Sequence, residues 1–269
     1  MYTIHPIKSG TLTSPKNALT YKHDPHTDVV FPTLSFLLQS TDDGPTVLID
    51  TGVRPREDPY IERRGKIVGP PYGGPEPVRD GLAEYGLGPA DVDTVILTHL
   101  HHDHVGNVNL FPDVRFVCQR EEWETARDPL PLYVDSYPDV DVDWLADNAD
   151  LDLVDGETDL APGITLVPTP GHTEGSQSVI VETSAGPHAL IADLAYNQHN
   201  LDPGRDHIID AAGRYLPVTP RPDLPYIPPG TLVDIPEAYD SIERIRDRVG
   251  SDGAIIPGHD PEYAPEYPE

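Results

Sequence analysis

One short stretch of the chain gathers the side chains best suited to hold metal ions. Residues 98–104 read Thr-His-Leu-His-His-Asp-His, which is a His-x-His-x-Asp-His pattern. Imidazole and carboxylate groups together suit zinc, iron or manganese. The spacing lets His99 and His101 point one way while Asp103 and His104 point another. Chance clustering is a poor explanation, because the four side chains stand at fixed spacing directly after an apolar strand-like run.

Three further candidate ligands follow downstream, and each comes just after an apolar segment. His172 follows the run 164–167, Asp193 ends the run 189–193, and His259 follows Ile255 and Ile256. A site for two metal ions needs about this many donors. The sequence therefore predicts seven metal ligands: His99, His101, Asp103, His104, His172, Asp193 and His259.

Strands must deliver these side chains, and β-branched runs indicate where the strands lie. In the first half we expect strands at 2–6, 34–38, 46–50, 92–97 and 114–118. We expect four more in the second half, as a repeat of the layer, at 151–154, 164–167, 177–182 and 188–193, and a last strand at 254–257.

Helices are expected where apolar residues recur at helical spacing. The clearest is 236–249, which has Pro236 near its start and Gly250 as its terminator. Others are expected at 78–85 and 121–127, with a short helix opening at 103–109. The stretches 53–77, 129–150 and 197–231 show no periodicity and are expected to be irregular, with 129–150 lying across the open face of the site.

The ligand pattern resembles the metallo-β-lactamase superfamily over nearly the whole chain. This resemblance implies an α/β fold, the αββα sandwich, as a single domain over residues 1–269. Within the superfamily the chain is most similar to the N-acyl-homoserine lactonases, the quorum-quenching enzymes. Tyr196 stands three residues after Asp193, as in those lactonases, and residues 169–178 resemble their Thr-Pro-Gly-His-x-x-Gly-His-Gln-Ser, except that Ser176 replaces the second His.

The resemblance also implies roles for individual residues. His99, His101 and His172 would bind one divalent metal ion, and Asp103, His104 and His259 a second, with Asp193 bridging them. Zinc is the expected metal, and iron, manganese or cobalt also suit these ligands. A hydroxide shared by the metals would attack the lactone carbonyl, Tyr196 would donate a hydrogen bond to the carbonyl oxygen, and Asp103 would carry the proton to the leaving alkoxide.

Residues outside this set have weaker claims to the site. Asp50-Thr51-Gly52 resembles the superfamily's Asp-Thr-Gly, whose Asp supports the metal loop, but a simple turn cap fits Asp50 equally well. Tyr60 and Tyr72 lie in a loop that helps form the substrate rim in lactonases, so both are candidates for acyl-chain contacts. His199 and His207 are more typical of surface loop histidines than of ligands.

The length and composition of the chain limit its expected cellular location and its binding partners. The chain has 269 residues, 37% of them hydrophobic, which is enough for a full core. The N-terminus lacks the features of a signal peptide, and no apolar run approaches the ~20 residues of a membrane span. Cys118 is the single cysteine, expected to be a buried apolar residue. A cytoplasmic location follows as the default, and both monomer and homodimer remain open.

The charge is strongly acidic. There are 46 acidic and 18 basic residues, a formal net charge of −28, and only four of the basic residues are lysines. Repulsion between these charges destabilises a compact state in dilute salt, and molar salt screens it. Such an acidic, lysine-poor composition is typical of proteins from salt-in halophiles. The same charge argues against nucleic acids and anionic membranes as partners and leaves a small-molecule lactone or ester as the expected substrate.

Other hydrolases of the superfamily would use the same ligands. A glyoxalase II-like thioesterase is one alternative, although the basic C-terminal helical region that such enzymes use for glutathione is missing here. A hydrolase of another lactone or ester is the strongest competitor. A metal-binding protein without catalytic activity is disfavoured, because all seven ligand positions are filled.

Overall fold

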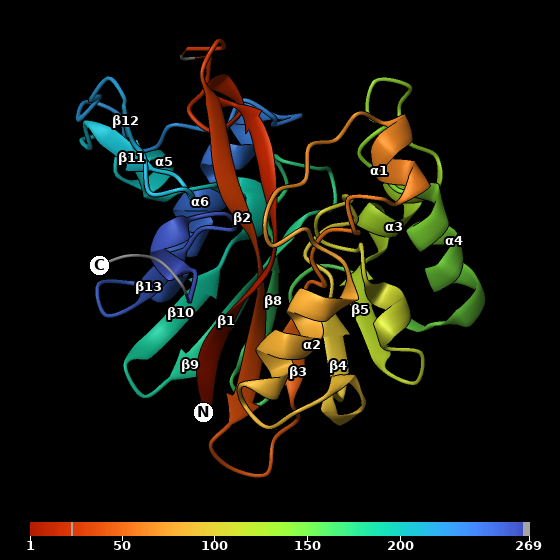
Figure 1. The fold of residues 1–269 in the computed structure, drawn as a ribbon. Coiled ribbons are helices and arrows are strands. Elements are labelled where there is room, and N and C mark those ends of the chain that lie inside the picture. The colour runs from red at the N-terminus through yellow and green to blue at the C-terminus, as the bar shows by residue number, and fades with distance from the viewer. Residues whose placement is uncertain (23, 266–269) are drawn as a thin grey trace.

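A computed structural model of the chain describes residues 1–22 and 24–265. Within this part, two mixed sheets are stacked face to face (Figure 1). The first sheet has six strands in the order β1-β2-β3-β4-β5-β6 and the second has five in the order β13-β10-β9-β8-β7. The strands of the first sheet are β1 (Tyr2–Pro15), β2 (Asp28–Ser40), β3 (Val47–Ile49), β4 (Thr94–Ile96), β5 (Arg115–Gln119) and β6 (Asp150–Val154).

The second sheet is antiparallel except where β10 pairs with β13 in parallel. Its strands are β7 (Thr158–Ala161), β8 (Ile164–Pro168), β9 (Gln177–Thr183), β10 (Gly186–Leu190) and β13 (Ala254–Ile256). A separate two-stranded ribbon joins β11 (His207–Ile209) to β12 (Tyr215–Pro217). In the first sheet, β3, β4, β5 and β6 run parallel, so the loops after β3 and β4 leave from one edge of that sheet.

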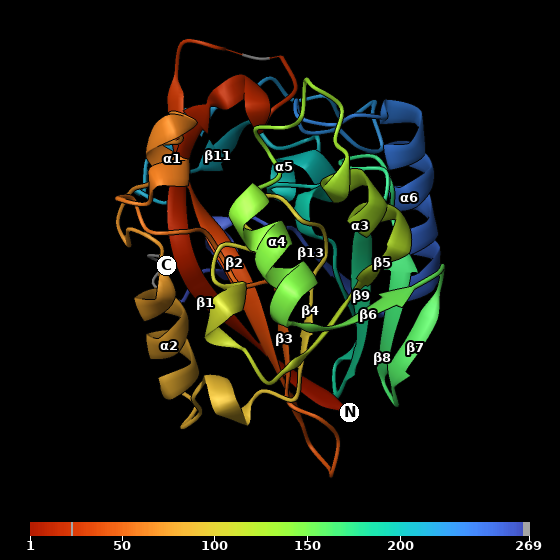
Figure 2. The same ribbon diagram turned by 90° about the vertical axis from the view of Figure 1, so that its right-hand side faces the viewer.

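Helices cover both outer faces of the sandwich. Helices α2 (Pro75–Ala83), α3 (Arg120–Arg127) and α4 (Asp139–Asn148) lie on the side of the first sheet, and α6 (Ile235–Val249) lies on the side of the second (Figures 1 and 2). Two short helices, α1 (Pro59–Arg63) and α5 (Gln198–Leu201), belong to loops. The predicted αββα sandwich is confirmed.

Alternating side chains along the strands divide the core into layers. Leu38 and Ile49 pack between the two sheets against Ile164 and Val179, whereas Leu37 faces α2 on the other side. This is the two-residue period of a strand with both faces buried. On the far side, a third cluster joins the second sheet to the apolar face of α6. Each fully buried Leu, Ile or Val stabilises the fold by about 1.5–3 kcal/mol relative to exposure.

Several expectations about the elements are corrected by the structure. The stretch 129–150 contains α4, whose buried Val142 and Leu145 face the core. Its helical periodicity of apolar residues is not evident in the sequence because acidic residues lie between them. The strand at 151–154 lies in the first sheet as β6, paired in parallel with β5, and is not part of the second layer. The region 197–231 contains α5, β11 and β12, and a 3₁₀ turn at Val108–Leu110 is the only helical segment described within 103–110. Cys118 is buried, as expected.

No helix in the described ranges has the length and apolarity to cross a membrane.

The acidic surface leads to a first prediction, on salt. The exposed Asp139, Asp143 and Asp147 stand four residues apart along α4, a spacing at which like charges repel. Raising the ionic strength from 0.1 M to 1 M shortens the Debye length from about 10 Å to about 3 Å. We therefore expect the thermal unfolding midpoint to rise by roughly 10 °C between dilute buffer and molar KCl, which corresponds to screening worth about 3 kcal/mol.

Differential scanning calorimetry of protein at constant metal content measures this midpoint. Sucrose at the same osmolarity serves as the control. Sucrose stabilises proteins because it is excluded from their surface, and it does not screen charge. A midpoint that stays level or falls with KCl would rule out charge repulsion as the dominant effect of this surface.

Candidate metal centre

All seven predicted ligands come together where loops from the two sheets meet. His99, His101, Asp103 and His104 lie in the loop after β4, and His172 lies in the loop after β8. Asp193 belongs to a 3₁₀ turn that follows β10, and His259 follows β13. Their donor atoms form two groups within which the atoms lie no more than 4.8 Å apart: His99, His101 and His172 in the first, and Asp103, His104, Asp193 and His259 in the second.

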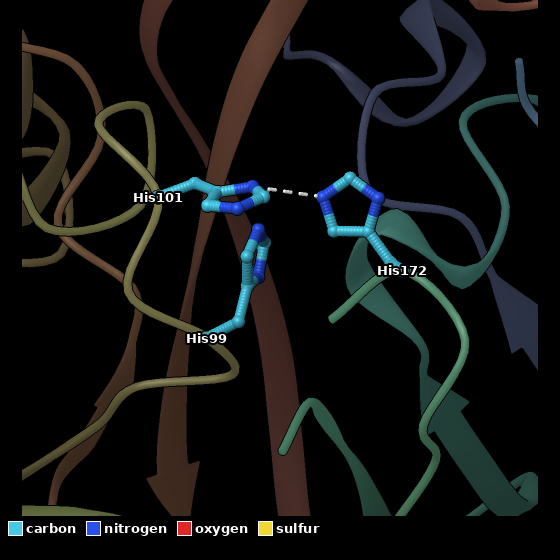
Figure 3. Close-up of side chains that lie close together, drawn as sticks. All are labelled: His99, His101 and His172. Carbon is cyan, nitrogen blue, oxygen red and sulfur yellow. Dashed lines mark hydrogen bonds between the residues drawn. The ribbon is translucent and has the colours of Figure 1, made fainter. Parts of the chain in front are cut away.

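In the first group, three imidazole rings converge on one point (Figure 3). His101 Nδ1 and His172 Nε2 are 2.9 Å apart, and the ring of His99 lies edge-on to both. Within the described residues, the buried Nε2 of His99 has no hydrogen-bond partner. Burial and the neighbouring imidazoles lower the pKa of His99 well below its usual value. Neutral, converging nitrogens with an unpaired buried atom fit a divalent cation.

Asp193 lies between the two groups and faces each with a different oxygen. Its Oδ2 is 3.2 Å from His172 Nε2 and 3.9 Å from His99 Nε2. Its Oδ1 is 3.1 Å from His104 Nε2 and 2.9 Å from His259 Nε2. Burial opposes ionisation of this carboxyl, but His259 and His104 hold its pKa well below the usual range. One carboxylate therefore serves both groups.

Hydrogen bonds to the outer ring nitrogens orient two of the histidines. His104 Nδ1 is 2.7 Å from Asp50 Oδ2, and His259 Nδ1 donates to the carbonyl of Pro32 at 2.8 Å. In each case Nε2 is left to face the centre. The Asp50 carboxylate also accepts hydrogen bonds from the amide and hydroxyl of Thr98, at 2.8 and 2.7 Å. Asp50 thus supports the loop that carries four of the candidate ligands, and it is more than a turn cap.

Two non-glycine residues next to the centre have left-handed backbone conformations. Asp50 has φ +58° and Ala192, which precedes Asp193, has φ +44°. Such conformations cost of order 1–3 kcal/mol outside glycine and gather at functional sites. The amide of Gly258 donates to the carbonyl of Ala192 at 3.0 Å, and a Cβ at Gly258 would collide with that residue. The turns that carry Asp193 and His259 are therefore packed on each other.

Ser176, the departure from the lactonase pattern, has a local role. Its hydroxyl donates to the carbonyls of Thr169 and Thr173, at 2.8 and 3.2 Å, inside the loop that carries His172. Gly171 in the same loop has φ +139°, and a Cβ there would collide with Ala238 of α6. The loop is thus closed on itself and held against α6 without a second histidine.

Tyr196 lies beside the centre, as its offset from Asp193 predicts. Its ring is buried, with its centroid 4.8 Å from that of His259 and 6.0 Å from that of Phe31. The hydroxyl of Thr231 donates to the Tyr196 oxygen at 3.0 Å, and the phenol in turn donates a hydrogen bond to the Asp193 carboxylate, so the phenolic O–H points toward the candidate ligands. Burial, followed by the Asp193 charge, raises the pKa of Tyr196 well above its usual value.

A cavity of about 180 Å³ opens onto this centre. His101, Asp103, His172, Asp193 and Tyr196 line its base, and Leu12, Phe31, Ile67 and Val233 are among its apolar walls. Tyr133 and Ser136 from the stretch 129–150 also line it, in keeping with the position expected for that stretch.

Four weaker candidates do not line this cavity. Tyr60 is buried and donates to the carbonyl of Asp135, and Tyr72 lines a separate groove. His199 is buried within α5, so its expected position in a surface loop is wrong, and His207 is paired with Asp206 at 2.7 Å.

Sequence reasoning missed one buried carboxyl that ties the first group together. Glu122 of α3 is fully buried, and its Oε1 accepts the amide of Leu100, between His99 and His101, at 2.8 Å. Its Oε2 accepts the hydroxyl of Thr173, next to His172, at 2.5 Å. Burial raises its pKa to about 7. In the sequence, Glu122 stands among other acidic residues of an amphipathic helix, so no local signal separates it from a solvated side chain.

Gln177 joins the same two loops from the other side. Its side-chain amide donates to the carbonyl of Leu97, and its backbone amide donates to that of Thr98, both at 2.9 Å. Gln119 donates to its side-chain oxygen at 2.9 Å. Gln177 belongs to the lactonase-like motif at 169–178. Membership of this motif is the sequence feature that could have indicated its structural role.

Comparisons with known proteins agree with this geometry. Residues 28–259 match the family model of the metallo-beta-lactamase superfamily. The N-acyl homoserine lactonase AiiB of Agrobacterium fabrum is 33% identical over 184 residues, which cover 64% of this chain and 66% of that protein. An N-acyl homoserine lactonase of a Bacillus species is 29% identical over 180 residues, which cover 64% and 67%. The chain thus spans about two thirds of the length of these relatives.

Solved structures show the same fold. An N-acyl homoserine lactone hydrolase, determined with N-hexanoyl-L-homoserine at its catalytic metal center, superposes with a TM-score of 0.72 at 22% identity, covering 96% of this chain and 93% of that one. AidC, a dizinc quorum-quenching lactonase, superposes with a TM-score of 0.68 at 14% identity, covering 98% and 88%. From its fold, the arrangement of its donor groups and the match over residues 28–259, the chain belongs to the metallo-β-lactamase superfamily.

Proposed function

We propose that this protein is a dinuclear metal hydrolase that opens the ring of N-acyl-homoserine lactones or similar lactones. The observation that carries the proposal is the position of Asp193, whose two oxygens face two separate groups of donor atoms beside the Tyr196 phenol. The activities named for the lactonase relatives from Bacillus and Agrobacterium support the same reaction.

In this proposal the donor groups hold two divalent metal ions. His99, His101 and His172 bind the first ion, Asp103, His104 and His259 bind the second, and Asp193 is shared. Zinc is the proposed metal, and the nitrogen-rich donor set also accepts iron, manganese or cobalt. When bound, such ions supply a nucleophilic water at neutral pH and polarise the scissile carbonyl.

The side chains of the protein supply the remaining steps. The Tyr196 phenol, which hydrogen-bonds to Asp193, turns its O–H to the substrate and donates a hydrogen bond to the carbonyl oxygen as negative charge develops there. Asp103 lies in the same cavity and takes the proton from the attacking water and delivers it to the leaving alkoxide. The apolar walls, with Leu12 and Phe31 among them, exclude water and accept an acyl chain.

A hydrolysis panel at molar salt tests this function. Zinc-loaded protein is given short- and long-chain N-acyl-homoserine lactones, γ-butyrolactone, S-lactoylglutathione and an aryl ester, and acid release is followed with a pH indicator. We expect the acyl-homoserine lactones to have the highest kcat/KM. Cleavage of the thioester alone would contradict the lactonase proposal and favour the glyoxalase II-like alternative, and preference for another ester would favour a different hydrolase.

A second prediction concerns Glu122. Replacing it with alanine leaves the buried amide of Leu100 without an acceptor and frees the loop that carries His172. Mutation of residues that support metal ligands without binding the metal themselves typically lowers metal affinity by about 10- to 100-fold. We therefore expect Glu122→Ala to weaken binding of the first zinc ion by about that factor and to affect the second ion much less. Calorimetric titration of the metal-free protein with zinc measures both affinities.

Two variants control for nonspecific effects. Glu124→Ala removes an exposed carboxylate from the same helix and should leave both affinities unchanged. Glu122→Gln keeps an oxygen for the Leu100 amide and should recover most of the lost affinity. Equal weakening of both zinc sites in Glu122→Ala would show a general loss of structure and would contradict a role specific to the first group.

A further inference from the structure

Lys66 is one of only four lysines in the chain, and it lines the cavity at the candidate metal centre. Its backbone is firmly placed. The amide of Lys66 donates to the carbonyl of Ile61 at 3.1 Å, and the segment that follows pairs with β1 through Thr13 N to Ile67 O at 3.0 Å and Gly69 N to Thr11 O at 2.9 Å. The lysine is therefore held at one position on the cavity wall and does not sit in a loose loop.

The ammonium group of Lys66 makes no direct contact with an acidic side chain among the described residues. The side chain is half-buried, and no hydrogen bond or ion pair of its ammonium group is found among the described residues. Burial lowers the pKa of Lys66, and the charge of Asp103 opposes this effect. A partly desolvated ammonium group gains stability when a ligand brings an anionic oxygen into direct contact with it.

Lys16 shows how this chain satisfies a lysine that has only a structural role. It is buried, and its ammonium donates to the carbonyl of Pro217 at 2.5 Å and lies 3.6 Å from Asp24 Oδ2. Lys22, in contrast, is exposed and lies over the ring of Tyr21. Lys66 fits neither pattern, because it is withdrawn from solvent and faces the cavity.

Lys66 is also the only lysine or arginine among the described residues that line the cavity. An ammonium group recognises anionic oxygens through charge-assisted hydrogen bonds, which are about twice as strong as neutral ones. The apolar part of the wall beside it, including Ile67 and Leu12, suits the alkyl portion of the same ligand. The chemistry of this wall therefore matches a chain that carries a carboxylate.

We propose that Lys66 is a specificity-determining residue that binds a carboxylate group within the cavity. This inference rests on the proposed function, because it assigns the ligand chemistry of the same site. The carboxylate has two sources. It is either a substituent carried by the substrate, or the group created when water adds to the carbonyl carbon, the acyl C–O bond breaks, and an acid and an alcohol are formed.

The first arm of the test asks whether Lys66 binds a carboxylate that is carried by the substrate. The ratio of kcat/KM for N-(5-carboxypentanoyl)-homoserine lactone to that for N-hexanoyl-homoserine lactone is measured with zinc-loaded protein. The two acyl chains have the same number of carbon atoms and differ only in their end group, carboxylate or methyl, and the ratio cancels general losses of activity. If the substituent is the source, we expect Lys66→Met to lower this ratio by about tenfold and Lys66→Arg to restore it.

The second arm detects the carboxylate formed by hydrolysis and requires no turnover. Binding of N-hexanoyl-homoserine, the ring-opened acid, and of N-hexanoyl-homoserine amide to zinc-loaded protein is measured by NMR titration. If the product acid is the source, we expect Lys66→Met to weaken binding of the acid relative to that of the amide by about tenfold, again with recovery in Lys66→Arg. Lys22→Met removes the same charge from an exposed position and should change neither ratio.

The two arms also separate this inference from the proposed function. If no lactone is hydrolysed, the lactonase proposal fails, while the titration with N-hexanoyl-homoserine and its amide still tests Lys66. If lactones are hydrolysed but Lys66→Met changes neither ratio by more than about twofold, Lys66 does not bind a carboxylate and the inference is overturned. An equal change in Lys22→Met would overturn it as well, since the effect would then come from net charge.

Discussion

Replacing Asp193 with alanine is expected to lower lactone hydrolysis by more than about a hundredfold and to leave fewer than two metal ions bound per chain. Loss of a partner outside the ligand shell already costs about 10- to 100-fold, and Asp193 is proposed to be a ligand of both ions. Its two oxygens lie 3.2 Å from His172 Nε2 and 2.9 Å from His259 Nε2, so a single truncation removes a donor of the second group together with the oxygen that faces the first.

Metal content by mass spectrometry, together with kcat/KM for N-hexanoyl-homoserine lactone, measures the effect of Asp193→Ala. Asp147→Ala is a matched control, because it removes an exposed carboxylate from α4, far from any of the seven donors in sequence. Retention of two metal ions and full turnover in Asp193→Ala would disprove the shared-ligand assignment. Circular dichroism of both variants distinguishes loss of metal from loss of the fold.

Replacing Tyr196 with phenylalanine is expected to lower kcat by about a hundredfold, the size typical of losing one donor to a developing oxyanion. The ring and its packing against His259 and Phe31 are kept in this variant, so metal content and KM should change little. The Thr231 hydroxyl already donates to the phenol oxygen, so the phenolic O–H donates to Asp193 in the free protein and to the carbonyl oxygen when substrate is bound. Steady-state kinetics with zinc-loaded enzyme provides the measurement.

Tyr215→Phe is the control for Tyr196, since Tyr215 is 71% exposed and lies in the β11–β12 ribbon. Thr231→Val tests the second half of the arrangement, because it removes the hydrogen bond that orients the phenol. We expect Thr231→Val to reduce kcat less than Tyr196→Phe does. A change of less than about twofold in Tyr196→Phe would exclude the phenol as the donor to the carbonyl oxygen.

The centre could be predicted from the sequence because its most informative part is local. His99, His101, Asp103 and His104 lie in one loop after a β-branched strand, and each of the other three donors follows an apolar run. Strands buried on both faces, such as β3 and β4, appear as short apolar runs and were found for that reason. The αββα layering followed from the family resemblance, and the structure confirms it.

Long-range pairing and buried polar contacts could not be predicted in this way. Helix α4 contains four aspartates within ten residues, and only its packing shows that Val142 and Leu145 form an apolar face. Strand β6 lies in the first sheet because it pairs with β5, which no local pattern encodes. Glu122 is distinguished from its acidic neighbours only by its partners across the core. The single-domain extent, the cytoplasmic location and a halophilic source stay predictions.

The separation of the donors along the chain determines when during folding the centre can form. The four donors of residues 99–104 are neighbours even in an unfolded chain, but His172, Asp193 and His259 reach them only after β8, β10 and β13 have paired and the two sheets have packed. Closing these long loops costs entropy, which the pairing of the strands and the packing of the sheets offset. Under the proposed function, a complete metal centre therefore forms only when the sheets have packed, and an ion held by donors from both sheets would cross-link them and stabilise the finished sandwich by mass action.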